Sequence, residues 1–287
     1  MNQKYNALFT PWKICNVEIP NRIVQCSMGG TSLFGWMEPS HLDKEAAYFL
    51  LNRAQDGVGL ILPGMQCIKD PILGRWLYQN DKMFKDLEVY MKEFHKTGSK
   101  LFIQLAAGMG RSMAITKPMV MLLKNPLLGK IASPIADLDY ITASASATPN
   151  RWYEEIKSRP MTIQEIHDQV DAFAKTAKKL MDAGVDGVEI HAVHEGYLLD
   201  CFAMSLFNKR TDKYGGDLNG RLRFAIEIVQ KIKQYCGEDF PVILRFSLKS
   251  YIKDLRQGAV PGETFTELGR DTDACAVPKA SANSQKQ

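Results

Sequence analysis

Residues 187–197, GVEIHAVHEGY, combine two histidines and a tyrosine at the end of a short apolar run. His191 and His194 could together hydrogen-bond one carbonyl oxygen and stabilise the negative charge that builds there when a hydride adds to a conjugated carbon. The phenol of Tyr197 could then deliver a proton to the adjacent carbon. Two other interpretations stay open. The histidines could be satisfied at a strand end with Tyr197 packed, or they could bind a metal with Glu195, although zinc-binding helices prefer histidines at i and i+4.

A second polar segment, NKRTDKYGGDLNGRLRF, runs from Asn208 to Phe224. Its glycine pair allows a turn with φ > 0, and Asn219 is expected to cap the helix that follows. Arg210 and Asp212 could pair across the turn. Of the two interpretations of this loop, scaffold or substrate contact, we favour the scaffold.

Short β-branched runs alternate with longer amphipathic runs, and this alternation is typical of β/α units built on a parallel sheet. Each expected strand is mostly apolar, as a strand covered on both faces should be. The five expected strands are Ile23 to Ser27, Leu60 to Pro63, Leu101 to Leu105, Gly187 to His191 and Val242 to Phe246. The expected helices are Ser40 to Ala54, Asp81 to Thr97, Thr162 to Ala183 and Arg221 to Tyr235.

Turn and capping residues mark the boundaries of these helices. Thr162 followed by Glu165 fits a capping box at the start of the third helix. The residues expected to end the four helices are Gly57, Gly98, Gly184 and Gly237. The pattern predicts an α/β fold. Because five strands cannot close an eight-stranded barrel, it leaves open a smaller open sheet or an incomplete barrel.

Two segments depart from the alternation. Ala106 to Met161 is a connection of about 55 residues, and connections of that length are usually functional lids or disordered segments. It leaves the carboxyl end of a strand, where a β/α barrel builds its active site. After Arg270 the sequence DTDACAVPKASANSQKQ loses all periodicity. We therefore expect residues 271–287 to be a disordered tail, and its abrupt start favours a frameshifted or misjoined end.

Composition argues against several classes of function. The 287 residues are 45% hydrophobic and 24% charged, the make-up of a globular protein. The net charge is +4 with no dense basic stripe, so nucleic-acid binding is not expected. The chain shows neither an apolar signal core nor an uncharged apolar run of about 18 residues, so we expect no membrane association and a cytoplasmic location. The six scattered cysteines form no C-x-x-C pair and are expected to be reduced thiols.

The combination of VEIHAVHEGYLLDCF and NKRTDKYGGDLNGRLRF resembles the old yellow enzyme family of FMN-dependent NADH:flavin oxidoreductases. The HAVHEGY form is most similar to its long bacterial members, the 2-enoate reductases, 2,4-dienoyl-CoA reductases and bile-acid oxo-cholenoate oxidoreductases. The opening LFTPWKICNVEIPNRIV is also similar to the family's start. The resemblance implies a TIM (β/α)8-type barrel, incomplete at about five of eight β/α units, with residues 1–270 as a partial FMN-binding barrel.

Carried over residue by residue, the resemblance implies a flavin site at the strand ends. Residues against the flavin would be Ser27, Met28, Gly29 and Gly64, with Gln104 at the pyrimidine edge of the isoalloxazine and Arg245 beside N1 and O2. An amide can satisfy a donor and acceptor edge, and a guanidinium can hold an anionic hydroquinone. His191 and His194 would hold the substrate oxygen, and Tyr197 would be the proton donor.

Several features depart from the family pattern. Gly29 stands where many relatives carry a Thr or Cys that tunes the flavin, and Glu195 is an extra residue relative to the short members. The chain shows no counterpart of strands six to eight, whose loops hold the FMN phosphate in such barrels. Full-length long members carry a [4Fe-4S] centre and a C-terminal FAD and NAD(H) domain, for which this chain has no equivalent cysteine run.

The resemblance implies an ene-reductase in which NAD(P)H-derived electrons reduce the C=C bond of an α,β-unsaturated carbonyl, an enoate, an enoyl-CoA or an oxo-steroid. The alternative is a truncated, non-catalytic barrel fragment that cannot hold FMN alone. The expected partners are a small-molecule substrate and either a second copy of the chain or a protein that completes the barrel.

Overall fold

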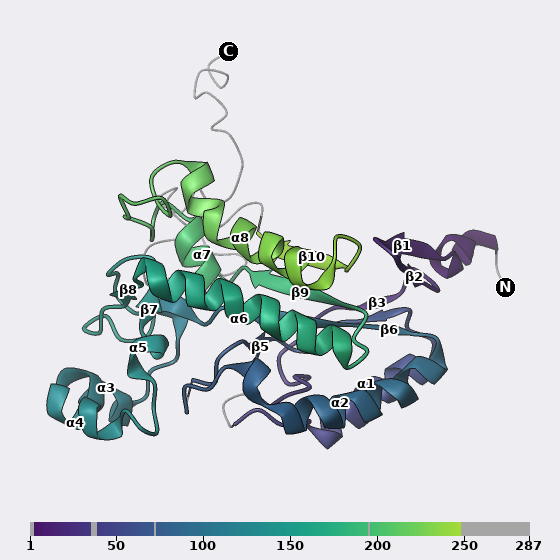
Figure 1. The fold of residues 1–287 in the computed structure, drawn as a ribbon, viewed down its shortest axis with the longest axis horizontal. Helices are drawn as coiled ribbons and strands as arrows, with labels where there is room; N and C mark the ends of the chain where they lie inside the picture. The colour runs from purple at the N-terminus through teal and green to yellow at the C-terminus, as the bar shows by residue number, and fades with distance from the viewer. Residues whose placement is uncertain (1–2, 36–38, 72, 195, 248–287) are drawn as a thin grey trace, which may run out of the picture. The chain divides into compact units, whose positions relative to one another are not determined.

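A computed structural model describes residues 3–35, 39–71, 73–194 and 196–247 (Figure 1). Glu195 and the expected tail at residues 271–287 lie outside the described residues. The chain divides into two compact units. The first, here called the sheet unit, comprises Met1–Ala107, His167–His191 and Glu227–Arg245, and the second, here called the connection unit, comprises Gly108–Ile166, Ala192–Ile226 and Phe246–Gln287.

The sheet unit is built on one sheet with the strand order β10-β9-β6-β4-β3, and β5 also pairs with β6. The pairs β3 with β4, β4 with β6, β5 with β6 and β6 with β9 are all parallel. The strands are β3 (Val24–Gln25), β4 (Leu60–Ile61), β5 (Gln66–Cys67), β6 (Lys100–Ala106), β9 (Gly187–Ala192) and β10 (Val242–Phe246). All five expected strands are present, and the fold is the α/β architecture of an incomplete barrel.

Four long helices follow the strands in the predicted order: α1 (Lys44–Gln55), α2 (Asp81–Phe94), α6 (Ile163–Asp182) and α8 (Leu218–Cys236). Asp43 starts α1, because its carboxylate accepts the backbone N–H groups of Glu45 and Ala46 at 2.9 and 3.0 Å. The glycines expected to end the helices, Gly57, Gly98, Gly184 and Gly237, have φ between +81° and +93°. Since glycine adopts such angles without steric cost, these predicted ends are confirmed.

The expected cap at Asn219 is wrong. Helix α8 begins at Leu218, so Asn219 already lies in its first turn. Asp217 caps the helix instead, because its Oδ1 accepts the backbone N–H of Gly220 at 2.9 Å. A carboxylate one residue before a helix reaches the N–H at the third helical position, and it also favours the positive end of the helix dipole.

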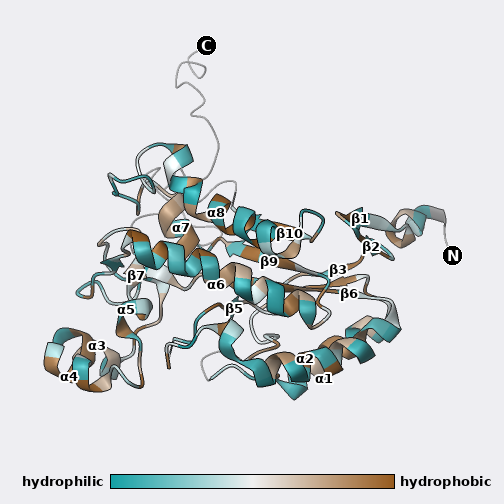
Figure 2. Ribbon diagram, viewed as in Figure 1, coloured by the Kyte–Doolittle hydropathy of each residue, from teal (hydrophilic) through white to brown (hydrophobic). Residues whose placement is uncertain are grey.

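Apolar side chains follow the helical and strand periods. Figure 2 shows α6 alternating between hydrophilic and hydrophobic residues along its length. Helix α2 buries Met83, Phe84, Leu87, Met91 and Phe94, and strand β6 is buried from Leu101 to Ala106. Surface ion pairs join neighbouring helices of the sheet unit: Lys179 with Asp81 at 2.6 Å between α6 and α2, and Lys231 with Asp171 at 3.6 Å between α8 and α6.

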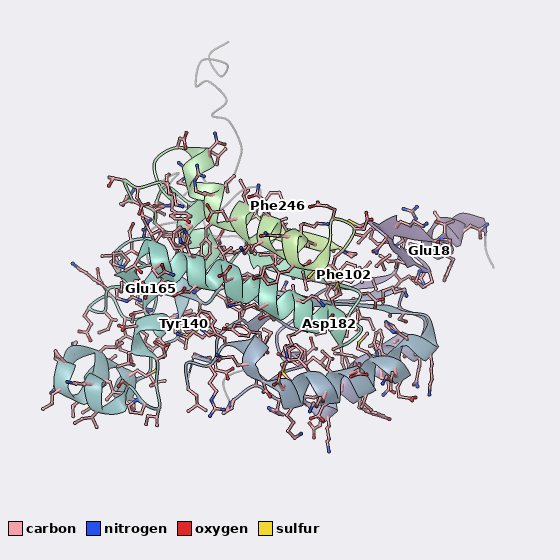
Figure 3. The ribbon with its side chains drawn as sticks, in the orientation of Figure 1. Glu18, Phe102, Tyr140, Glu165, Asp182 and Phe246 are labelled. Atoms are coloured by element: carbon pink, nitrogen blue, oxygen red, sulfur yellow. The ribbon has the colours of Figure 1, made fainter. Side chains whose placement is uncertain are left out.

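An N-terminal hairpin, β1 (Trp12–Ile14) with β2 (Val17–Ile19), packs on one end of the sheet. Its Ile19 forms a buried cluster with Leu60, Leu62 and Phe102, the last labelled in Figure 3. Partly buried side chains packed against this cluster are Trp12, Ile14, Val17 and Ile243. Because side chains alternate along a strand, one face of the sheet carries Leu60, Leu62 and Phe102. The hairpin covers this apolar part of that face.

The connection unit contains most of the long connection, and much of that segment is helical. Its elements are η4 (Gly110–Ser112), α3 (Lys117–Lys124), α4 (Pro126–Ala132), α5 (Leu138–Ile141), β7 (Ala143–Ser144), β8 (Arg159–Pro160) and α7 (Leu198–Ala203). The predicted capping box is confirmed, because the backbone N–H of Glu165 donates to Thr162 Oγ1 at 3.2 Å and the Thr162 N–H donates to Glu165 Oε2 at 2.7 Å.

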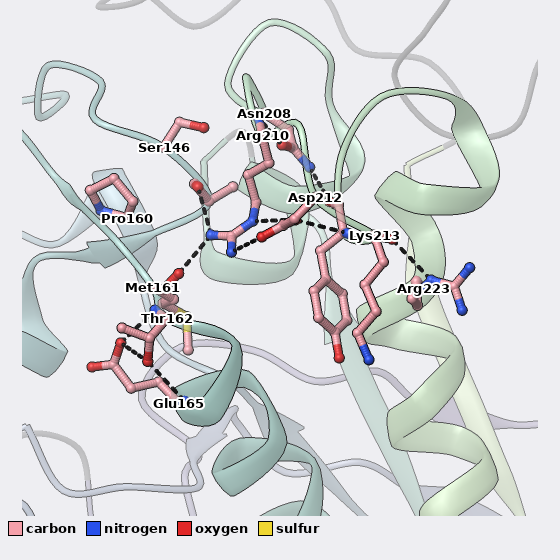
Figure 4. Close-up of polar contacts among 12 residues, drawn as sticks. Ser146, Pro160, Met161, Thr162, Glu165, Asn208, Arg210, Asp212, Lys213 and Arg223 are labelled. Carbon is pink, nitrogen blue, oxygen red and sulfur yellow. Dashed lines mark hydrogen bonds and ion pairs between the residues drawn. The ribbon is translucent and has the colours of Figure 1, made fainter.

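The predicted pair between Arg210 and Asp212 is also confirmed, and Figure 4 shows its surroundings. The guanidinium donates from Nε and Nη2 to the two carboxylate oxygens at 3.0 and 2.5 Å. Its Nη1 donates to the carbonyl oxygens of Ala145 and Met161 at 3.2 and 2.7 Å. One guanidinium thus ties the 208–224 segment to the residues that directly follow β7 and β8, which supports the scaffold interpretation of this loop.

The described helices include none that is long and apolar enough to cross a membrane. The cysteines are free thiols at Cys15, Cys26, Cys67, Cys201 and Cys236, and Cys275 lies outside the described residues.

Replacing Gly187 by alanine should destabilise the sheet unit. A Cβ at this position would lie 2.8 Å from three ring carbons of Phe102, its register partner in β6. Overpacking of this kind costs about 2 kcal/mol, measurable as a lower urea midpoint. Gly29→Ala is the matched control, because its Cβ would meet nothing within 4 Å, and equal stability of the two variants would contradict the packing argument.

Glu165→Gln should remove a pH-dependent part of the stability. Glu165 stands at the start of α6 (Figure 3), and its hydrogen bond from Arg159, at 2.6 Å, lowers the pKa of the carboxyl to about 2 from 4.5. A pKa depressed in the folded state stabilises the protein above pH 4.5, and this stabilisation is lost as the pH falls towards 2. Since the Glu165 side chain is 36% exposed, we expect a loss of about 1 kcal/mol at neutral pH.

The measurement is urea unfolding of the wild type and Glu165→Gln between pH 7 and pH 3. The difference in unfolding free energy should narrow as the pH falls. Glu155→Gln, which breaks the exposed pair with Lys124, is the control and should change stability little at any pH. A difference that stays constant with pH would show that Glu165 does not act through its charge.

Candidate active site

Part of the candidate site is a group of polar residues towards the carboxyl ends of the strands in the sheet unit. Gln104 of β6 and Glu189 of β9 are register partners, two residues along from the pair Phe102 and Gly187. Strand alternation therefore puts Gln104 and Glu189 on the same face as Phe102, with His191 two residues further along β9. This face is apolar at the hairpin end and becomes polar towards the carboxyl ends of the strands.

Four residues form one connected set of hydrogen bonds, here called the amide network. Ser27 Oγ donates to Gln104 Oε1 at 2.8 Å, and Gln104 Nε2 donates to Glu189 Oε1 at 2.5 Å. Arg245 Nη1 donates to the backbone carbonyl of Ser27 at 3.3 Å. The amide of Gln104, which is only 1% exposed, thus directs its oxygen to Ser27 and its nitrogen to Glu189.

Glu189 is a buried carboxyl group that the sequence did not single out. Burial raises its pKa, while the hydrogen bond from Gln104 and the positive charge of Arg245 act in the opposite direction. The signal for this residue was present in the motif, because Glu189 is a charged residue within the otherwise apolar strand GVEIHA and shares the strand face of His191.

The expected flavin contacts at the first two strand ends differ in their surroundings. Met28 is 49% exposed, and a Cβ at Gly29 would meet nothing within 4 Å. At Gly64, in contrast, a Cβ would lie 2.6 Å from the Met28 carbonyl oxygen and 2.8 Å from the Ser32 nitrogen. The chain's own backbone therefore requires glycine at position 64, and contact of these residues with flavin stays a prediction.

The two histidines belong to different units. His191 ends the part of β9 in the sheet unit and is 3% exposed. His194 lies in the connection unit, is exposed, and has φ +92°, an uncommon angle for a residue with a side chain. Its ring lies edge-on to that of Tyr197, with centroids 5.3 Å apart and planes at 66°. The structure therefore brings together His194 and Tyr197 in one unit, and Ser27, Gln104 and Arg245 in the other.

Close backbone packing within the connection unit holds the turn that carries Tyr197. A Cβ at Gly196, where φ is +117°, would lie 2.8 Å from Arg111 Cγ and Ser112 Oγ. The N–H of Leu198 donates to the Gly108 carbonyl at 3.0 Å, and Tyr197 occupies the N-cap position of α7.

The metal interpretation gains no support in the described part of the chain. No group of three His, Cys, Asp or Glu residues there could hold an ion, and Glu195 lies outside the described residues.

The donors and acceptors of the amide network fit a flavin. A primary amide has two N–H groups and two lone pairs on its oxygen, and the network uses one of each on Gln104. One donor and one acceptor remain, the combination that matches the N–H and carbonyl groups of an isoalloxazine pyrimidine edge. Arg245 adds a half-buried guanidinium, with five N–H donors, from the neighbouring strand end. These residues could hold FMN.

Comparisons with known proteins point to the same cofactor chemistry. A model of the NADH:flavin oxidoreductase / NADH oxidase family matches residues 7–280. The chain is 41% identical over 278 residues to a cinnamate reductase from Clostridium sporogenes, covering 94% of this chain and 38% of that protein. It is 32% identical to an NADPH dehydrogenase from Bacillus velezensis, covering 85% of this chain and 64% of that protein. The chain therefore spans less than two thirds of the length of these curated relatives.

Solved structures show the same fold. The Old Yellow Enzyme from Pichia sp. AKU4542 matches with a TM-score of 0.67 and 25% identity, over 90% of this chain and 64% of that one. The old yellow enzyme homologue from Zymomonas mobilis matches in fold with a TM-score of 0.65 and 22% identity, over 88% of this chain and 66% of that one. The family model matches residues 7–280, and the observed fold agrees with it. The chain therefore belongs to the NADH:flavin oxidoreductase / NADH oxidase family, the old yellow enzyme family.

Proposed function

We propose that this protein is an FMN-dependent ene-reductase that uses electrons from NAD(P)H to reduce the C=C bond of an α,β-unsaturated carbonyl compound. The observation that carries the proposal is the amide network at the carboxyl ends of β6, β9 and β10, whose remaining donors and acceptor suit a flavin. Similarity to a protein named cinnamate reductase supports an enoate as the substrate, with an enoyl-CoA or an oxo-steroid as the other candidates.

Each polar residue has a defined role in this proposal. Gln104 and Arg245 hold the isoalloxazine, with Ser27, Met28, Gly29 and Gly64 beside it. Bound FMN supplies hydride transfer between the nicotinamide and the β-carbon of the substrate. His191 and His194 donate hydrogen bonds to the substrate carbonyl oxygen and stabilise the negative charge that develops there. Tyr197 gives its phenolic proton to the α-carbon and regains one from water, so one hydride and one proton are added across the double bond.

A second candidate function is a non-catalytic protein that holds FMN only with a partner. In the described part of the sheet, exposed apolar side chains on the two edge strands favour it, because Val24 of β3 is 37% exposed and Leu244 of β10 is 40% exposed. Edge strands with exposed apolar side chains are surfaces on which another chain can pair or pack. The partner could be a second copy of this chain or a protein that completes the barrel.

Flavin retention distinguishes the two candidates. The purified 287-residue chain is mixed with excess FMN, desalted and scanned. The ene-reductase proposal expects a retained absorption band at about 450 nm, the range of an oxidised flavin cofactor. Gln104→Leu should lose most of the band, because it removes both remaining amide contacts, whereas Gln79→Leu, at the exposed last residue of the 3-10 helix Leu77–Gln79 before α2, should keep it. A wild-type chain without the band would favour the second candidate.

Tyr197→Phe should impair proton delivery while leaving flavin reduction intact. Loss of a general acid lowers the rate of its step by about 10²-fold or more. Stopped-flow spectroscopy of the flavin band separates reduction by NAD(P)H from reoxidation by cinnamate, and only the second should slow. Tyr48→Phe, on an exposed phenol of α1, is the matched control. Reoxidation at the wild-type rate in Tyr197→Phe would remove the tyrosine from the mechanism.

A further inference from the structure

We propose that Glu189 is a positioning residue for the flavin site: its carboxylate fixes the direction of the Gln104 amide and balances the Arg245 charge. The inference rests on the proposed flavin site and adds a residue to it. Glu189 accepts a hydrogen bond from Gln104 Nε2 at 2.5 Å and interacts electrostatically with Arg245. It would act through Gln104 and Arg245 and not by touching the flavin.

The Gln104 amide has two possible orientations, which exchange its oxygen and its nitrogen. Which orientation it takes depends on Glu189, the neighbour that can accept a hydrogen bond but not donate one. Ser27, on one side of the amide, carries a hydroxyl that can donate or accept, so it can pair with either end. Glu189 lies on the other side of the amide. Its ionised carboxylate can accept hydrogen bonds but has no proton to donate. A reversed amide would place its oxygen 2.5 Å from the Glu189 carboxylate oxygen, and two acceptors at that distance repel each other.

The direction of the amide decides what Gln104 offers to a ligand. With Nε2 against Glu189 and Oε1 against Ser27, the second N–H and the second lone pair project at fixed positions. Reversal would exchange the remaining donor and acceptor. A flavin edge with a fixed order of N–H and carbonyl groups would then meet N–H against N–H and oxygen against oxygen.

Two groups of the amide network oppose the effect of burial on Glu189. Burial is the largest effect and raises the pKa of this carboxyl, while the hydrogen bond from Gln104 and the positive charge of Arg245 lower it and so favour the carboxylate. Arg245 is placed for this by its bond to the Ser27 carbonyl at 3.3 Å. The electrostatic attraction between the guanidinium and the carboxylate is mutual, so the loss of either removes a stabilising charge from the other.

The test begins without flavin. In ¹⁵N-edited NMR of the full chain, the Gln104 side-chain NH2 signal, assigned by its loss in Gln104→Leu, should show one strongly downfield proton in the wild type. Glu189→Gln should abolish that shift, because a glutamine can donate or accept and no longer selects one direction. Ser27→Ala should preserve it, since the hydroxyl does not determine the direction.

A second buried carboxyl provides the matched control. Asp70 is 7% exposed, has a pKa raised mainly by burial, and hydrogen-bonds Ser40 in the same unit. Asp70→Asn should therefore leave the Gln104 signal unchanged even if it lowers overall stability. An unchanged Gln104 signal in Glu189→Gln would overturn the proposal.

FMN binding gives the second measurement. Fluorescence titration should show that Glu189→Gln raises the Kd for FMN about tenfold and that Asp70→Asn leaves it unchanged. A wild-type Kd in Glu189→Gln would show that the amide direction does not matter to the flavin and would overturn the proposal. If the wild type binds no FMN, the flavin role fails together with the proposed function, and the NMR result alone decides whether Glu189 sets the amide direction.

Discussion

The hydrogen bond between Gln104 and Glu189 joins two buried polar side chains on adjacent strands, and it depends on the register between β6 and β9. Burying an amide and a carboxyl is costly unless each is paired, so the two strands must stay in the register that sets these residues side by side. A shift of one residue would send Glu189 to the opposite face. The neighbouring pair resists such a shift, because the Phe102 ring occupies the space that only glycine at position 187 leaves free.

The sequence predicts the regular elements well because their signals are local. Short, mostly apolar β-branched runs mark the strands, and glycines at positive φ mark the helix ends. The β1–β2 hairpin escapes prediction because Cys15, not glycine, adopts the positive φ of 50° in its turn. The helix cap assigned to Asn219 belongs to Asp217 because two capping residues lie close together and the sequence does not show which of them lies just before the helix.

The candidate site is predictable in its residue types but not in its connections. Strand-end position and family resemblance select Ser27, Gln104 and Arg245, whereas the role of Glu189 depends on a contact with a residue 85 positions earlier in the chain. Its partner could be found only once the strand order placed β6 next to β9. The positive φ of His194 and its ring contact with Tyr197 are similarly invisible in the spacing, because the turn is set by packing of Gly196 against Arg111 and Ser112.

In the proposed reaction, the residues that would hold the flavin belong to the sheet unit, and the proton donor belongs to the connection unit. Groups that would hold an electron carrier need fixed direction and little solvent, and the amide network supplies both because its members are paired and its central pair, Gln104 and Glu189, is buried on adjacent strands. The group that delivers a proton must exchange it with water between turnovers, and Tyr197 is partly exposed at a turn instead of buried in a strand. Placing the two tasks on separate elements lets the carrier site stay rigid while the proton donor remains accessible. A substitution in the turn should therefore change the proton-transfer step without changing how firmly the carrier is held.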